Sequence, residues 1–181
     1  VSQLEQVARR GGIDIPPSRM YLMHASAKVT ELNAYVTGIG PSKRVVVWDT
    51  TIQKATPGEI LFIFGHEMGH YVLGHIRATI EFVAALLLIE FYLGYLALGW
   101  LVRRYGTAWK ITSQNNWAAL VALVLVFSVL SFLSEPIVNG YSRIHEHEAD
   151  VYGQEAIHGI VPDPATTAQQ AFQLLGETSL S

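Results

Sequence analysis

Apolar residues dominate two long stretches of the chain, and shorter runs alternate with polar residues elsewhere. Nearly every residue from 80 to 102 is apolar, and at about 1.5 Å per residue a helix of this length crosses roughly 30 Å of hydrocarbon. A second apolar run covers residues 117–133 and becomes longer when 136–138 are included. The pattern therefore predicts a transmembrane helical hairpin over residues 80–138.

The segment between the two runs, residues 103–116, has the composition of a loop at a membrane surface. Its positive charges are Arg103, Arg104 and Lys110. Trp and Tyr are enriched at both edges of a bilayer, and four such residues lie around this loop: Trp100, Tyr105, Trp109 and Trp117. The alternative is a pair of buried core helices, which would need more covering protein than a chain of 181 residues offers.

Residues 1–79 combine a short helix with small strands. The first segment, residues 1–10, has a weakly helical pattern. Runs rich in β-branched and aromatic residues follow at 21–27, 34–37 and 45–48, and turn-forming residues separate them. These runs predict a small antiparallel sheet.

One polar or mixed helix is predicted on each side of the apolar hairpin. Thr56, Pro57 and Glu59 supply a capping residue, a proline at the first helical position and the glutamate of a capping box. This helix is expected to continue to about Ile76. After the hairpin, residues 139–158 are polar and helical, and the glycine that follows ends the helix.

Composition and charge narrow the classes of protein. Hydrophobic residues make up 50% of the chain and the mean hydropathy is +0.29, which is more than a soluble core needs. The net charge of −3 provides no basic excess for binding phosphates, so we expect no nucleic-acid partner. Cysteine is absent, so a zinc site would use histidine and carboxylate ligands. The chain begins at Val1 rather than at methionine, and we expect a processed or partial chain.

The segment His66-Glu67-Met68-Gly69-His70 has the H-E-x-x-H pattern inside a predicted helix. At about 100° per residue, His70 lies about 40° from His66, so both imidazoles can bind one metal ion. Glu67 borders the same site and can act as a general base for an attacking water molecule. On a continuous helix His75 would point about 180° away from His66, so we do not expect it to be a ligand.

A third ligand is expected from the charged segment at residues 142–150. On a helix, Glu146 and Asp150 share one face with Arg143, whereas Glu148 points about 200° away from Glu146. The two histidines of the segment point about 100° to either side. The spacing favours Glu146 as a metal ligand and Asp150 as hydrogen-bond acceptor for a ligand histidine. The alternative for this segment alone is a solvated, charged helix face.

Together these motifs resemble the gluzincin peptidases typified by the CAAX prenyl protease and the heat-shock protease HtpX. The resemblance rests on His-Glu-Met-Gly-His at 66–70, Ser-Arg-x-x-Glu-x-x-Ala-Asp at 142–150 and Asn-Ala-Tyr-Val-Thr-Gly at 33–38. The sequence of residues 44–50, followed by Thr-Pro-Gly-Glu at 56–59, is similar to the CAAX prenyl protease branch. That branch also has two membrane helices between its metal motifs.

The resemblance implies further properties of the chain. It implies an edge strand in which Asn33, Ala34, Tyr35 and Val36 bind an extended peptide, a mode in which main-chain hydrogen bonds hold the substrate. It also implies an active site on the cytoplasmic side, whereas the positive charges of the loop, taken alone, would place the loop there. The closest branch would suggest a prenylated peptide as substrate, but the residues themselves do not encode recognition of a prenyl group.

The expected fold is therefore α+β, with a zincin-like small sheet on a metal helix and a second ligand helix. We assign 1–79 and 139–181 to the catalytic domain, with a membrane hairpin at 80–138 inserted between them. The expected activity is that of a zinc-dependent membrane endopeptidase that uses metal-activated water and binds one zinc ion per chain. Arg143 is expected beside the metal ligands. The expected partners are a peptide substrate and a lipid bilayer. The alternative is a membrane protein with a structural or regulatory zinc site, which would need four protein ligands and no base.

Glu90 is an ionisable residue within the first apolar run. A carboxylate at the centre of a bilayer costs about 2.5–3.5 kcal/mol on insertion scales, so it should face protein or water. By its distance from the loop, Glu90 lies at the depth of Ser128 and Ser131. We expect a polar contact across the hairpin there.

Overall fold

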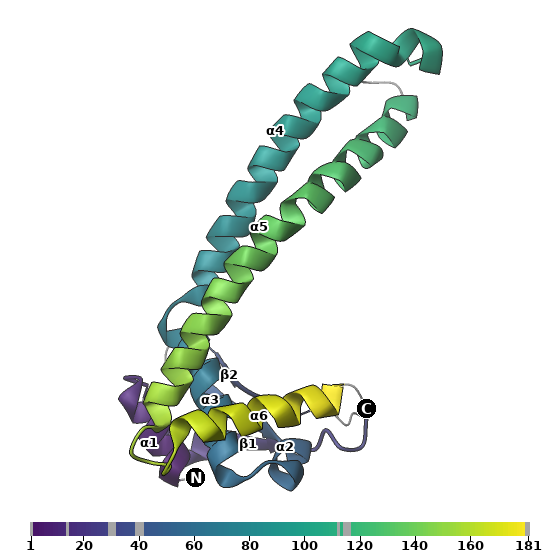
Figure 1. Ribbon diagram of the computed structural model, residues 1–181. Helices are drawn as coiled ribbons and strands as arrows, with labels where there is room; N and C mark the ends of the chain where they lie inside the picture. The colour runs from purple at the N-terminus through teal and green to yellow at the C-terminus, as the bar shows by residue number, and fades with distance from the viewer. Residues whose placement is uncertain are drawn as a thin grey trace. The chain divides into compact units, whose positions relative to one another are not determined.

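The computed structural model describes residues 2–13, 15–28, 32–38, 42–111, 113 and 117–179. The chain divides into two compact units, Val1–His75 with Ile144–Ser181, and Ile76–Arg143. Figure 1 shows the elements in chain order, which are α1 (Ser2–Arg10), η1 (Pro17–Arg19), β1 (Met20–Met23), β2 (Ala34–Thr37), β3 (Arg44–Trp48), α2 (Asp49–Lys54), α3 (Pro57–Val72), α4 (His75–Trp109), α5 (Trp117–Ile157) and α6 (Pro164–Ser179).

The small sheet has the strand order β1-β3-β2 and is mixed, so the expectation of an antiparallel sheet is wrong for one of its two pairings. β2 pairs antiparallel with β3, whereas β1 pairs parallel with it. β1 is also shorter than the predicted strand, because the chain leaves the sheet to bind a carboxylate. The backbone N–H groups of Ala25 and Ser26 donate to Asp49 Oδ1 at 2.9 and 3.0 Å.

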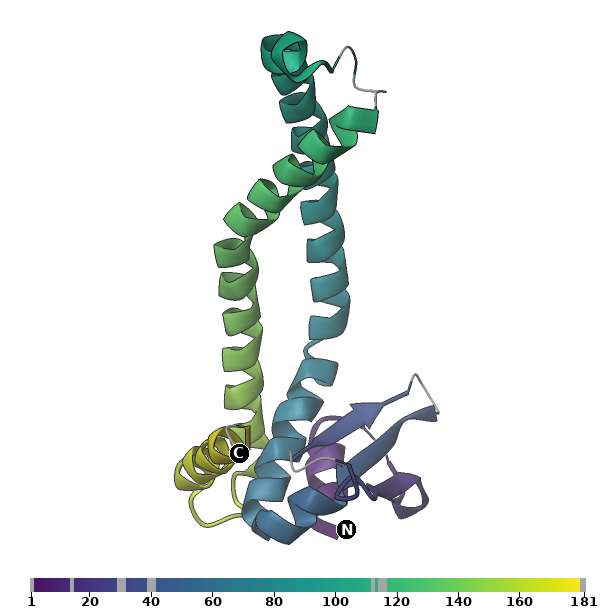
Figure 2. The same cartoon turned by 90° about the vertical axis from the view of Figure 1, so that its right-hand side faces the viewer.

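α3 is the central element of the first unit. Its start is the predicted capping box, in which Thr56 and Glu59 cap each other's backbone N–H groups. Phe62, Phe64 and Met68 of this helix are fully buried. α3 packs against β2 and against α6, and Figure 2 shows it between the sheet and the yellow C-terminal helix. The core of the unit therefore forms around the helix that carries the histidines.

α3 ends at Val72, earlier than the predicted end near Ile76. Gly74 has a positive φ of 74°, which a glycine adopts without steric cost, and the chain turns there before α4 begins at His75. The expected orientation of His75 assumed one continuous helix, so that expectation is wrong. The turn changes which side chains His75 can contact.

α6 is an element that the sequence reasoning missed. It begins after Asp163, whose side chain accepts a hydrogen bond from the backbone N–H of Thr166 at 3.1 Å. An N-cap aspartate followed by proline at the first helical position is a helix-start signal. Ala168 and Ala171 of this helix are buried in the core of the first unit.

The second unit is formed by most of α4 and the first part of α5, which run antiparallel beside each other (Figure 1). Both helices are long and apolar enough to cross a membrane. α5 is continuous through Pro136, so the predicted polar helix at 139–158 and the second apolar run belong to a single helix. Its end at Ile157 is followed by Gly159, whose φ is 72°.

Contacts within the hairpin combine close packing with one buried polar group. A Cβ added to Gly94 would lie 3.1 Å from the ring of Phe127, so the glycine allows a close approach of the two helices. Glu90 is buried, and it accepts a hydrogen bond from Ser134 Oγ at 2.5 Å. The predicted polar contact across the hairpin therefore exists, but its partner is Ser134. Ser128 instead donates to the carbonyl of Val124 in its own helix at 2.9 Å.

Candidate metal centre

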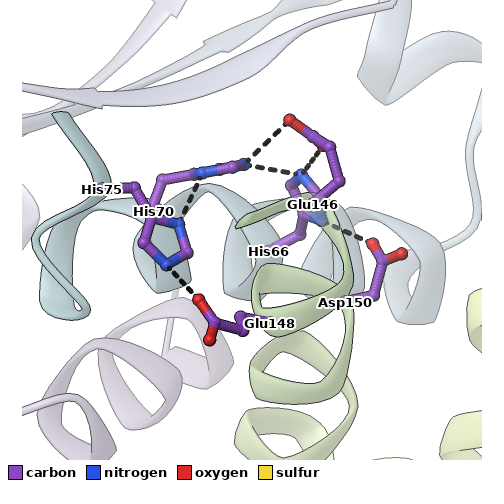
Figure 3. A network of polar contacts seen from close by, with 6 residues as sticks. All are labelled: His66, His70, His75, Glu146, Glu148 and Asp150. Atoms are coloured by element: carbon purple, nitrogen blue, oxygen red, sulfur yellow. Dashed lines mark hydrogen bonds and ion pairs between the residues drawn. The ribbon is translucent and has the colours of Figure 1, made fainter. Parts of the chain in front are cut away.

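Two helices of the first unit bring three potential metal ligands together. His66 and His70 lie one turn apart on α3, and their Nε2 atoms are 3.2 Å apart. Glu146 comes from α5, with its Oε2 3.5 Å from His66 Nε2 and its Oε1 3.7 Å from His70 Nε2. Figure 3 shows the three side chains converging. They form a group whose ligand atoms all lie within 4.8 Å of one another.

The donor set fits a zinc ion. Bonds of about 2.0–2.1 Å in a tetrahedral arrangement place neighbouring ligand atoms roughly 3.3 Å apart. The observed separations of 3.2, 3.5 and 3.7 Å lie close to that value. Two imidazoles and one carboxylate are also a ligand set that catalytic zinc sites use, with a fourth position left for water or substrate.

Small residues allow α3 and α5 to approach closely enough to form this group. A Cβ added to Gly153 would lie 3.0 Å from the backbone nitrogen of His66. A Cβ added to Gly69 would lie 3.2 Å from Cα of Ala149, which is itself fully buried. Sequence reasoning passed over these glycines, although Gly69 lies within the H-E-x-x-H segment. They set the distance between the helix with the histidines and the helix with Glu146.

Asp150 lies one turn after Glu146 and contacts the other nitrogen of a ligand histidine. Its Oδ1 is 2.8 Å from His66 Nδ1. A carboxylate accepts hydrogen bonds, so Nδ1 of His66 donates to Asp150 in this contact, and the lone pair of the neutral ring lies on Nε2, which faces Glu146. Arg143, which the sequence places on the same face, is exposed and belongs to the second unit.

Glu67 borders a small cavity next to the histidines. Burial raises the pKa of Glu67 above its ordinary value, while His66 opposes this shift and Glu146 adds to it. The cavity has a volume of about 110 Å³ and is mostly apolar. Its lining comes from α3, α6 and the residues before β2: Leu32, Asn33, Phe62, Ile63, His66, Glu67, Phe172 and Leu175. A partly buried carboxylate thus borders a cavity beside the candidate ligands.

β2 is an edge strand of the sheet. The backbone carbonyl of Asn33 accepts from Trp48 N–H at 3.0 Å, and its N–H donates to Thr51 Oγ1 at 2.8 Å. Hydrogen-bonded and non-bonded pairs alternate along an antiparallel ladder, so Tyr35 also bonds inward to β3. Ala34 and Val36 therefore turn their backbone N–H and C=O groups to the open edge.

A second group of polar side chains lies beside the first. His75, His145 and Glu148 have ligand-type atoms within 4.8 Å of one another. His75 Nδ1 is 3.0 Å from His70 Nδ1, and His75 Nε2 is 3.1 Å from Glu148 Oε2 (Figure 3). The sequence reasoning gave neither His75 nor Glu148 a role, because both were judged from the geometry of isolated, continuous helices.

A pair of histidines one turn apart, a carboxylate from a second helix and a partly buried glutamate beside them make the kind of site that metallopeptidases use. The chain belongs to peptidase family M48, whose family model matches residues 1–178. This confirms the resemblance that the sequence motifs indicate.

Relatives of known name agree with this family. The chain is 41% identical over 168 residues to "Uncharacterized metalloprotease YhfN" of Bacillus subtilis (strain 168), covering 93% of this chain and 38% of that protein. It is 26% identical over 159 residues to "Probable CAAX prenyl protease 1" of Schizosaccharomyces pombe, covering 85% of this chain and 32% of that protein. The chain thus spans about a third of the length of these relatives.

A solved structure has the same fold. The crystal structure of S. mikatae Ste24p superposes with a TM-score of 0.64 at 23% sequence identity, covering 96% of this chain and 43% of that one. At this identity the similarity establishes the arrangement of the elements. The mostly helical chain with a small sheet and two long apolar helices is therefore a Ste24-like fold.

Proposed function

We propose that the chain is the catalytic part of a membrane-embedded, zinc-dependent endopeptidase of the gluzincin type. The observation that carries this proposal is the position of Glu67 between two histidines that converge with Glu146, at the edge of a cavity. A purely structural zinc site uses four protein ligands and has no need of a base. Membership of peptidase family M48 and the metalloprotease names of the relatives support the same activity.

In the proposed reaction, each residue of the site has a defined task. His66, His70 and Glu146 would hold the ion, which when bound would supply Lewis acidity toward the scissile carbonyl and a site for water. Glu67 would accept a proton from the attacking water as the water oxygen adds to the carbonyl carbon. When the carbon–nitrogen bond breaks, Glu67 passes the proton to the leaving amine.

The open edge of β2 is the proposed binding site for the substrate backbone. Ala34 and Val36 turn their N–H and C=O groups outward, so an extended peptide can add to the sheet as a further strand. Asn33 lines the cavity together with His66 and Glu67, so it lies where the peptide would meet the metal site. Tyr35 uses its backbone inside the sheet and contributes only its side chain. The apolar cavity wall favours an apolar substrate side chain beside the scissile bond.

The hairpin is the proposed membrane anchor of the site. α4 and α5 each contain a segment long and apolar enough to span a bilayer. The relatives include proteins named CAAX prenyl protease 1 and protease HtpX homolog. We place the active site on the cytoplasmic side, which is the side that the family resemblance implies.

Replacement of Glu67 by Gln tests the proposed function. The chain is purified in detergent and supplied with zinc, its zinc content is measured, and cleavage of a mixture of unmodified peptides is followed by mass spectrometry. Glu67→Gln should retain zinc and lose about 10²–10⁴-fold in turnover, because the amide cannot accept the proton. The matched control Glu155→Gln, on the exposed side of α5, should leave both properties unchanged.

Two results would contradict the proposal in different ways. Near wild-type hydrolysis by Glu67→Gln would show that Glu67 is not the base. A wild-type chain that binds zinc at His66 and His70 but cleaves none of the peptides would instead support the alternative of a structural or regulatory site.

A further inference from the structure

His75 is a buried histidine whose two ring nitrogens both have polar partners. It is only 5% exposed. Its Nδ1 lies 3.0 Å from His70 Nδ1 and its Nε2 lies 3.1 Å from Glu148 Oε2. Figure 3 shows the three side chains in a row that begins at the metal group and ends at a carboxylate. Neither of these two contacts is needed to hold the ion.

The proton positions in this row follow from the proposed zinc site, on which the inference rests. Nε2 of His70 faces His66 and Glu146, so it must offer its lone pair to the ion. A neutral imidazole then carries its proton on Nδ1, and His70 donates to His75 Nδ1. His75 must accept at Nδ1, so its own proton lies on Nε2 and is donated to Glu148. Every nitrogen in the row therefore has a single consistent role.

We infer that His75 and Glu148 form a relay that fixes the tautomer and orientation of the metal ligand His70. The arrangement parallels the contact of His66 with Asp150, where Oδ1 lies 2.8 Å from Nδ1. In one case the carboxylate contacts the ligand histidine directly, and in the other a second histidine lies between them. Partners of this kind raise the basicity of the ligand nitrogen and restrict ring rotation. His75 and Glu148 are thus positioning residues for the metal.

The fold brings the members of the relay together by two local features. The turn at Gly74, with its positive φ of 74°, returns the chain so that His75 faces back toward α3. Glu148 follows Glu146 by two residues on α5, and the two carboxylates therefore point to different sides of that helix. One helix thus supplies a ligand for the ion and a carboxylate for the relay.

A second metal ion held by His75, His145 and Glu148 is the competing interpretation. The rings of His75 and His145 are stacked, with centroids 4.2 Å apart and an angle of 2° between their planes. Lone pairs of imidazole nitrogens lie in the ring plane, so two parallel rings direct them side by side instead of toward a shared ion.

Proton positions also count against the second ion. A metal on Nε2 of His75 would move its proton to Nδ1, where it would face the Nδ1 proton of His70 at a separation of 3.0 Å. Two donors opposed at that distance repel. The ring of His145 instead limits rotation of His75 by stacking on it.

The test measures zinc affinity in the full chain in detergent, by competition with a chelator, and the visible spectrum of the cobalt-substituted chain. Glu148→Ala should weaken zinc binding by about 10-fold, and His75→Phe by up to about 100-fold. Glu148→Gln should fall between Glu148→Ala and wild type, because the amide oxygen still accepts the hydrogen bond without its negative charge. The cobalt spectrum should shift in the same order, since it reports the ligand field at His70.

Two control variants separate the relay from general destabilisation and from the second ion. Glu155→Ala removes an exposed carboxylate two turns further along α5 and should leave affinity and spectrum unchanged. His145→Phe keeps the ring stack but removes the nitrogens, and should also bind zinc as wild type does. Glu148 is 53% exposed at its side chain, so its variants should fold even if His75→Phe does not.

The outcomes distinguish the relay from the proposed function. If Glu148→Ala and Glu148→Gln both keep wild-type zinc affinity and cobalt spectrum, the relay is overturned while the zinc site stands. A wild-type chain that binds a second equivalent of zinc, lost in His145→Phe, would also overturn it. If Glu146→Ala fails to weaken zinc binding, the zinc site itself is wrong and with it the proposed function.

Discussion

The two compact units place their large apolar side chains differently. In the first unit, Phe62 and Phe64 are buried and polar groups converge around a potential ion. In the second unit, most large apolar side chains of the helices point outward, and Leu88 is 71% exposed. The exposed apolar surface of the hairpin suits lipid better than water. Lipid removes the cost of an exposed leucine and raises the cost of a polar group.

The largest effect is expected where the first unit depends on one polar residue. Glu146→Ala removes one of three protein ligands, so zinc affinity should fall by more than the roughly 10–100-fold that loss of a supporting contact costs. Peptide hydrolysis should be lost with it. Zinc content after dialysis, together with the hydrolysis rate, measures both effects.

His147→Ala is the matched control for this prediction. Histidine is a good zinc ligand and alanine offers no ligand atom. His147 is nevertheless exposed on α5 and lies outside the group of His66, His70 and Glu146. Its variant should keep zinc and activity. Should His147→Ala lose zinc while Glu146→Ala retains it, the rotation of α5 about its axis would differ from that in the structure.

A lysine placed in each unit sharpens the comparison between water and lipid. Leu88 lies near the middle of the first apolar run, and Leu88→Lys should cost about 2.5–3.5 kcal/mol in membrane insertion. Ile52 on α2 is also exposed, at 52%, yet Ile52→Lys should change stability by less than about 0.5 kcal/mol because that surface faces water.

Microsomal insertion of α4, scored by glycosylation, measures the first cost, and thermal unfolding in detergent measures the second. Equal insertion of wild type and Leu88→Lys would show that lipid does not cover this face of the hairpin. A large loss of stability in Ile52→Lys would show that Ile52 is covered by a partner.

The sequence predicted the parts of the site that one regular helix determines. The spacing of His66 and His70 and the common face of Glu146 and Asp150 need only about 100° per residue. The relay could not be obtained in this way, because it depends on the break between α3 and α4. Gly74, directly before His75, was the available signal, since glycine often ends helices in the left-handed conformation.

Fold prediction succeeded for local features and failed for features that depend on distant packing. The capping box at Thr56 and the apolar runs of the hairpin are local signals, and both elements are present. The direction of β1 relative to β3 depends on the path of the chain that connects them. The composition of the strands does not encode this path. α6 was missed although Asp163 and Pro164 form a helix start. The side chains that it buries, Ala168 and Ala171, are small and do not form a conspicuous apolar pattern in the sequence.

The smallest effect is expected at the polar contact between the two helices of the hairpin. Ser134 Oγ donates to Glu90 Oε1, and Glu90 is 7% exposed. Ser134→Ala should destabilise the hairpin by about 0.6 kcal/mol, the average for hydrogen bonds between membrane helices, because the unfolded helices also find polar partners. Ser128→Ala, which removes only a bond to the carbonyl of Val124 in the same helix, should have a smaller effect. Unfolding of the chain in mixed micelles, followed by circular dichroism, compares the stability of the two variants. A larger loss of stability in Ser128→Ala than in Ser134→Ala would show that Ser134 is not the partner that stabilises Glu90.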